Sequence, residues 1–305
     1  MPEPVFPLLS VRRGSGLTGG TRRSLHRGTG SEIAGSRGYR RGDSVRTIDW
    51  KASARVSSAR EADEFVVREH FAEDALRVVL VVDRRPEMRL FPEELPWLHK
   101  PEAVRVAGRM VVESALAAQG FPGYLELVDP RAPRWLAPRR QLDAVGIRER
   151  ELTRDEFTAP PENVTLALRH LLRRRAEAPR GTFVFVFSDF LGPQAPAVWS
   201  AAAARGWELV PVIVQDPRWE QSFPDVSGVS LPLATPGAGG AHAVRLGRNA
   251  ARARRDEHER RLETLLAGFR SGGLDPVLLS SHDPAAIRSE FMRWHERRLS
   301  RLRRR

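Results

Sequence analysis

The chain of 305 residues contains no cysteine. It therefore has no disulfide frame, no thiolate metal ligand and no cysteine nucleophile. Long apolar runs are missing too: VVLVV at 78–82 and FVFVF at 183–187 are far shorter than the roughly 20 residues of a membrane-spanning helix. The N-terminus lacks the charged-then-apolar order of a signal peptide. Together these absences predict a cytoplasmic protein without a membrane span.

Lysine is almost absent, since only Lys51 and Lys100 stand among the 50 basic residues. In a chain that otherwise uses arginine, Lys51 beside Trp50 attracts attention as a position that requires lysine. The net charge of +12 favours acidic partners, phosphate backbones or anionic membranes. No recognised nucleic-acid motif accompanies the charge, and part of it lies in the C-terminal run RRLSRLRRR. Nucleic-acid binding is therefore the alternative hypothesis.

From residue 76 onward the pattern is that of an α/β domain. LRVVLVVD, FVFVFSD and WELVPVIV are continuous apolar runs, typical of strands buried on both faces of a parallel sheet. Between and after them, apolar residues at helical spacing predict helices at 101–119, 138–151, 163–176, 193–206 and 248–270. GYLELVD and RWLA predict a hairpin, 227–234 an edge strand and LDPVLLSS a last strand, and Asp283 with Pro284 opens a terminal helix. Residues 1–35, rich in Gly, Ser and Thr, predict loops.

Signals for catalysis are poor. The eight histidines show no metalloprotease spacing, and there is neither a G-x-S-x-G elbow nor a P-loop. GTGSEIAG at 28–35 is glycine-rich but lacks the strand-before, helix-after context of a phosphate cradle. We expect a protein that is not an enzyme and has no cofactor, with a hydrolase as part of the alternative.

The segment GYRRGDSVRTIDWKASAR at 38–55 is the most specific feature of the chain. Charges of both signs alternate with aromatic residues, which favours a fixed ion-pair network over a solvated charge run. Two interpretations stay open: a structural brace joining the N-terminal arm to the sheet domain, or a docking surface for a partner. The residues concerned are Arg40, Asp43, Arg46, Asp49, Trp50 and Arg55.

This segment resembles the signature of the bacterial domain-of-unknown-function-58 family, which runs roughly R-x-Y-x-x-G-D-x-x-R-x-I-D-W-x-x-S-A-R. The resemblance extends over about residues 20 to 300, QDPRWEQSFPDVSG included. It implies a von Willebrand factor type A-like fold and, as partner, a MoxR-type AAA+ ATPase that matures or remodels protein complexes.

The same resemblance implies a divalent-ion site at the carboxyl ends of the strands, with Asp83 and Asp189 as acids and hydroxyls at the positions of Arg85 and Glu87. Arginine has no lone pair, so it does not ligate a cation. The threonine position falls on Glu162, or with a shift on Thr165. We therefore expect a degenerate site, Mg²⁺-free, in which the guanidinium of Arg85 or Arg84 neutralises both acids. The plainer alternative is that each acid only caps a helix or pairs locally.

The overall expectation is an α/β protein: a doubly wound, mostly parallel sheet of von Willebrand factor type A kind at 76–305, preceded by an irregular N-terminal arm at 1–75. Its expected function is non-catalytic protein interaction, as an adaptor or co-chaperone of the ATPase, through a face that includes Asp83, Arg85, Glu87 and Asp189.

Overall fold

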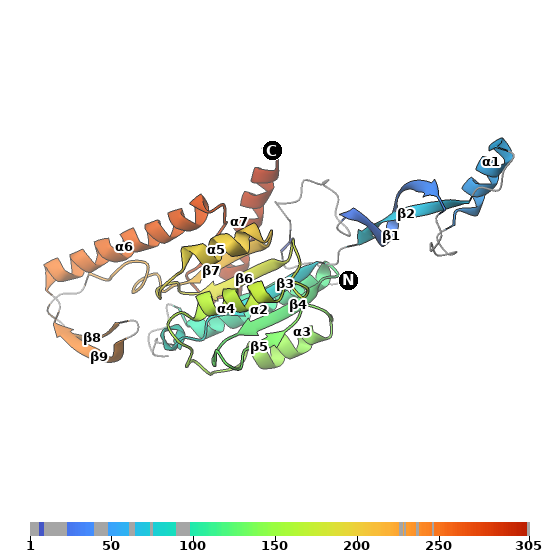
Figure 1. The fold of residues 1–305 in the computed structure, drawn as a ribbon. Helices are drawn as coiled ribbons and strands as arrows, with labels where there is room; N and C mark the ends of the chain where they lie inside the picture. Colours follow the sequence, from blue (N-terminus) through green and yellow to red (C-terminus); the bar gives the residue numbers. More distant parts are fainter. Residues whose placement is uncertain are drawn as a thin grey trace. The chain divides into compact units, whose positions relative to one another are not determined.

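The computed structural model describes residues 6–8, 23–39, 48–60, 65–73, 76–89, 98–225, 228, 230–235, 238–245 and 247–303. The chain divides into two compact units. The first comprises Met1–Gly14 and Arg77–Arg305, and the second, Ser15–Leu76, is inserted between these two parts. Figure 1 shows the elements of each.

The first unit is built on a six-stranded sheet in the order β10-β7-β6-β3-β4-β5. The strands are β3 (Arg77–Val82), β4 (Phe121–Glu126), β5 (Arg134–Leu136), β6 (Phe183–Ser188), β7 (Glu208–Val214) and β10 (Val277–Leu279). All neighbours pair in parallel except β5, which is antiparallel to β4. The mostly parallel α/β sheet expected from the apolar runs is confirmed.

Counted along the chain, these strands have the order 3-2-1-4-5-6 of a doubly wound sheet. The chain first proceeds from β3 outward through β4 and β5, then returns to the other side of β3 with β6. The carboxyl ends of β3 and β6 therefore flank the point where the strand order reverses, which is where open α/β sheets bind ligands.

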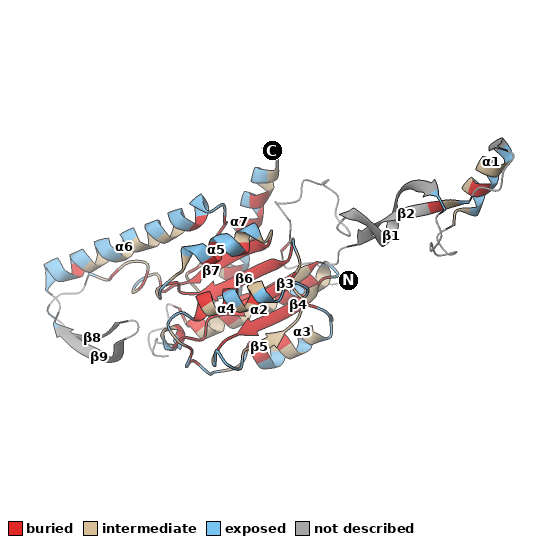
Figure 2. Cartoon of the chain, viewed as in Figure 1, coloured by how far each residue is buried: buried red, intermediate tan, exposed pale blue. Residues whose placement is uncertain are grey.

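Helices cover both faces of the sheet, and the central strands are buried throughout (Figure 2). Val79, Val81, Val184 and Val186 belong to the core beneath α4 (Asn163–Arg173) and α5 (Pro196–Ala204). The alternate residues point to the other face, because successive side chains of a strand point to opposite sides. There Phe185 contacts Phe291 and Trp294 of α7 (Pro284–Arg303), which packs beside α2 (Lys100–Ala117).

Several shorter elements complete this unit. A 3₁₀ turn, η2 (Pro86–Arg89), follows β3, and α3 (Asp143–Gly146) continues into a π-helical turn, η3 (Ile147–Glu151), where the sequence predicted one helix. The hairpin β8 (Ser230–Thr235) and β9 (Ala238–Arg245) precedes α6 (Arg248–Ser271). As expected, Asp283 caps α7, accepting the Ala286 N–H at 2.8 Å. No helix among the described residues is long and apolar enough to cross a membrane.

The second unit pairs β1 (Arg23–Gly38) with β2 (Val66–Glu73), antiparallel, and carries α1 (Trp50–Arg60). The prediction of loops over 1–35, and of an irregular arm, is therefore wrong for residues 23–35. The strand was not recognised in the sequence because its glycine and serine residues give no alternation of apolar and polar positions. Its pairing is interrupted by register shifts, as expected of a glycine-rich strand.

Phe6 ties the N-terminal segment to the first unit. Its ring is fully buried, stacks on Phe291 at 4.4 Å and meets Trp294 edge-on. Its N–H donates to the Ser114 hydroxyl at 3.1 Å. This segment thus belongs to the core of the sheet domain although the whole second unit separates it from β3.

We expect Phe6→Ala to lower the free energy of unfolding of the first unit by about 3–5 kcal/mol, because it removes a buried ring and leaves a cavity. Phe65→Ala, at a half-exposed ring of the second unit, is the matched control and should cost far less. Urea unfolding followed by tryptophan fluorescence measures both. Equal effects of the two changes would show that Phe6 does not anchor the segment.

Candidate functional site

A buried arginine lies between two acids at the point where the strand order reverses. The Nε of Arg85 donates to Asp83 Oδ2 at 2.9 Å, and its Nη2 donates to Asp189 Oδ1. The Ser188 hydroxyl also donates to Asp83 Oδ2, at 2.6 Å. Asp83 follows β3 and Asp189 follows β6, so two parallel neighbours present both acids at one edge.

The loop beyond β6 is shaped to admit the guanidinium. A Cβ on Gly192 would come within 2.9 Å of Arg85 Cζ, closer than real side chains approach. Phe190 adopts a φ of 55°, a left-handed conformation rare for non-glycine residues, and its N–H donates to the Ser188 hydroxyl at 3.0 Å. The backbone of this loop therefore fits the Arg85 bridge.

A second buried cation extends the network. Lys100, the first residue of α2, donates to Asp189 Oδ2 at 3.3 Å and to Glu220 Oε1 at 2.7 Å. Only 1% of its surface is exposed. The result is an alternating chain of charges, which we call the charge chain: Asp83, Arg85, Asp189, Lys100 and Glu220.

The pKa directions follow from burial and neighbours. Burial raises the pKa of Asp83 and of Glu220 above their ordinary values. Burial acts in the same sense on Asp189, but Lys100 and Arg85 outweigh it and hold its pKa low. For Lys100, Glu220 and Asp189 outweigh burial and raise the pKa, so its ammonium stays charged.

The segment after β7 holds the Glu220 end of the charge chain in place. Gln215 donates to the Asp189 carbonyl, while Asp216 accepts the N–H groups of Arg218 and Trp219 at 2.8 and 3.0 Å. The Glu220 carboxylate accepts the Asp216 N–H at 2.8 Å. From α6, Arg261 donates to the Glu220 carbonyl at 2.9 Å. The QDPRWE run thus holds one end of the charge chain and links it to α6.

These residues do not fit a divalent ion. Arg85 fills the space between the two acids, and Glu87, at the other expected hydroxyl position, lies 3.9 Å from Arg85 Nη1. Thr165 is buried in α4, and Glu162 is exposed. Within the described ranges no three His, Asp or Glu side chains are arranged to hold a metal. That the site is free of Mg²⁺ stays a prediction.

Arg84 points away from the charge chain and performs a separate structural task. Its Nε donates to Glu126 at 2.8 Å, and its Nη atoms donate to the carbonyls of Arg154 and Glu151 at 2.7 and 2.8 Å. The ring of Phe157 lies over it at 5.1 Å. Arg84 therefore fixes the loop that precedes α4, and of the two candidate arginines only Arg85 bridges the acids.

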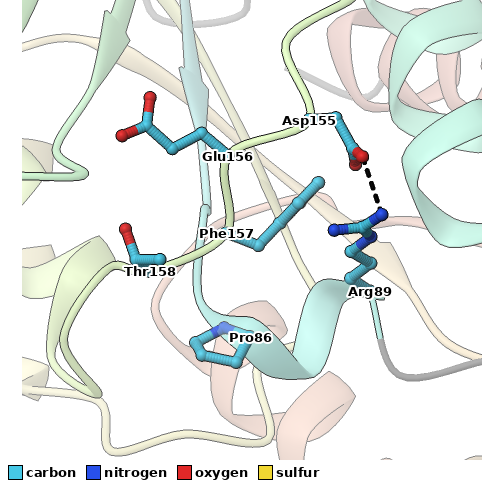
Figure 3. A pocket seen from close by; sticks show the side chains of 6 residues that line it. All are labelled: Pro86, Arg89, Asp155, Glu156, Phe157 and Thr158. Atoms are coloured by element: carbon cyan, nitrogen blue, oxygen red, sulfur yellow. Dashed lines mark ion pairs between the residues drawn. The ribbon is translucent and has the colours of Figure 1, made fainter.

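A pocket of about 420 Å³ opens beside the charge chain, between η2 and residues 155–158 (Figure 3). It is lined by Pro86, Arg89, Asp155, Glu156, Phe157 and Thr158. Asp155 and Arg89 form an ion pair of 2.8 Å, and both are exposed. The Arg84 guanidinium lies against the Phe157 ring, and the Arg84 carbonyl accepts the Ala159 N–H at 3.0 Å, so the shape of the pocket depends on Arg84.

In the second unit, part of the signature is a local brace. Asp49 caps α1 by accepting the N–H groups of Lys51 and Ala52 at 3.1 Å. Ser53 accepts the Val66 N–H at 2.8 Å, which ties α1 to β2. Trp50 is 59% exposed and Arg55 is exposed. Arg40, Asp43 and Arg46 lie outside the described residues, so the predicted ion-pair network stays a prediction.

Residues 35–264 match the family model described as "Protein of unknown function DUF58", which covers the signature, both strands of the Arg85 site and the QDPRWE run. The chain belongs to the DUF58 family. The resemblance expected from the signature is confirmed. No curated protein matches this DUF58 chain.

Solved structures give weak similarities. An aerotolerance-related membrane protein from Bacteroides fragilis is 12% identical with a TM-score of 0.41, covering 72% of this DUF58 chain and 100% of its own. The conserved hypothetical protein BatB from Bacteroides thetaiotaomicron is 12% identical with a TM-score of 0.40, covering 76% and 100%. PilB minor pilin from Streptococcus sanguinis is 10% identical with a TM-score of 0.35, covering 77% and 64%. At these scores the similarities carry no argument about function.

Sequence reasoning missed Lys100 and Glu220. It selected Lys51, which is exposed, over Lys100, which is buried between two acids. The rarity of lysine was the right signal. What distinguishes Lys100 from Lys51 is its position at the start of a helix that begins at the carboxyl edge of the sheet.

We expect Lys100→Met to lower the free energy of unfolding by about 3–5 kcal/mol, because it leaves the buried Glu220 carboxylate without its cation and Asp189 with Arg85 alone. Lys51→Met is the matched control and should change stability by no more than about 0.5 kcal/mol. Urea unfolding of both variants measures this. Adding Glu220→Gln to Lys100→Met should restore part of the loss, and a strictly additive double variant would contradict the charge chain.

Proposed function

We propose that this DUF58 protein is a non-catalytic protein-interaction module, an adaptor or co-chaperone of a MoxR-type AAA+ ATPase, with a von Willebrand factor type A-like sheet domain. The observation that carries the proposal is the Arg85 bridge: an internal guanidinium holds Asp83 and Asp189 where the resemblance places an ion. Neither acid is then an accessible base or nucleophile, because both are buried and hydrogen-bonded to cations.

The strand order with one antiparallel edge strand supports the von Willebrand factor type A-like part of the proposal. So does the clustering of polar residues at the carboxyl ends of β3, β6 and β7. In our proposal the charge chain replaces the ion as the element that fixes the loops of this face, and the partner binds what those loops present.

The pocket in Figure 3 is the part of this face that we assign to the ATPase. It is concave, exposes Asp155 and Glu156, and is backed by the buried Arg84. A fixed concave surface with a polar rim suits protein docking, since little order is lost on binding.

We expect the double change Asp155→Arg/Glu156→Arg to weaken binding to the purified MoxR-type ATPase of the same cells at least tenfold, roughly 1.4 kcal/mol. Glu257→Arg/Glu263→Arg on the exposed side of α6 makes the same charge change and should leave the affinity unaltered. Isothermal titration calorimetry measures the affinities, and thermal unfolding checks that each variant is folded. A wild type that does not bind the ATPase, or that turns over a substrate, would refute the proposal.

A further inference from the structure

The edge of the sheet opposite the pocket carries clusters of arginine. Parallel strands all begin at this edge, and the helices that connect them end there, because each runs antiparallel to the strands. One cluster is the run 173–175 at the end of α4. Another lies within residues 297–303, which include four arginines, and two of them pair with Asp275 at 3.4 and 3.7 Å. A third, Arg139 and Arg140, follows β5.

Contacts bring these clusters together. Glu177 pairs with Arg139 at 3.6 Å and with Arg174 at 3.3 Å, which joins the first and third clusters. Trp207 donates from its indole to the Ala178 carbonyl at 3.0 Å, and Arg298 of α7 pairs with Glu208 at 2.7 Å. The end of α7 therefore lies at the same edge of the sheet as the other two clusters, with Arg298 itself buried, and we call the combined surface the basic edge.

Helix electrostatics account for only part of it. Arginines in the last turns of α4 and α7 stabilise the negative ends of those helix dipoles. Arg139 and Arg140 do not, because they precede the N-terminus of α3, where a dipole disfavours cations. They stay exposed beside Leu142, which is 83% exposed, and one turn from Val145, which is 54% exposed. In the described part of the first unit, these two are the most exposed large apolar side chains.

We propose that the basic edge binds the surface of an anionic lipid bilayer, with Leu142 entering the headgroup region. Arginines attract anionic headgroups, and an exposed leucine close to cations gains free energy only from an apolar phase such as a bilayer. Duplex or single-stranded nucleic acid fits less well. The clusters spread over the ends of several elements instead of following a groove, and no exposed aromatic ring among the described residues lies there for base stacking.

The test uses the full chain and vesicles of phosphatidylglycerol and phosphatidylcholine in equal amounts, with pure phosphatidylcholine vesicles for comparison. We expect cosedimentation with the anionic vesicles only, weakening as salt rises. Each cation at such a surface contributes about fivefold, so Arg139→Gln/Arg140→Gln/Arg175→Gln should lower the partition coefficient about a hundredfold. Leu142→Ser should lower it several-fold at every salt concentration.

The control Arg248→Gln/Arg252→Gln/Arg288→Gln removes the same charge from exposed positions in the first two turns of α6 and α7. It should bind vesicles nearly as the wild type does. Equal losses in the two triple variants, or equal binding to both kinds of vesicle, would overturn the proposal. So would duplex DNA that binds more tightly than anionic vesicles and is unaffected by Leu142→Ser, since that result assigns the basic edge to nucleic acid. Binding to the ATPase is measured in a separate experiment, so a failure of vesicle binding and a failure of ATPase binding can be told apart.

Discussion

The Arg85 bridge is the interaction on which the carboxyl edge of the sheet depends. One guanidinium joins the residue after β3 to the residue after β6, the two strands between which the chain reverses its direction of winding. Without a cation there, two buried carboxylates would face each other, and one would have to take up a proton. Through Asp189 and Lys100 the same constraint reaches Glu220 and the segment after β7.

A buried charge chain is not the most stabilising way to fill this space. Apolar side chains of similar volume often give equal or greater stability, because desolvation of the ions offsets their attraction. Ions and their hydrogen bonds do specify geometry: each carboxylate accepts from named donors in fixed directions, including the backbone N–H groups of Arg85, Leu191 and Asp216. We infer that the charge chain serves to position the loops at the carboxyl edge of the sheet.

The fold was largely predictable from sequence, and the site only in part. Buried parallel strands are recognisable in the sequence as apolar runs. Parallel pairing of two such strands then places Asp83 and Asp189 at one edge of the sheet. Because arginine has no lone pair to ligate a cation, Arg85 was predicted to neutralise the two acids in place of an ion. Lys100 and Glu220 are 120 residues apart, and no local pattern pairs them. β1 was not predicted, because its glycines and serines do not give the alternation of apolar and polar residues that identifies a strand.

The match to the family model, residues 35–264, spans both units, and the two motifs within it do comparable physical work. In the signature, Asp49 and Ser53 satisfy backbone groups of α1 and β2 and leave Trp50 exposed beside Phe65, edge to face at 6.0 Å. In QDPRWE, Asp216 and Glu220 do the same for their loop and leave neighbouring side chains partly exposed. In both, the charged positions hold the backbone, and the residues between them are at least partly exposed. Variation at those intervening positions would then change the exposed surface without changing the fold.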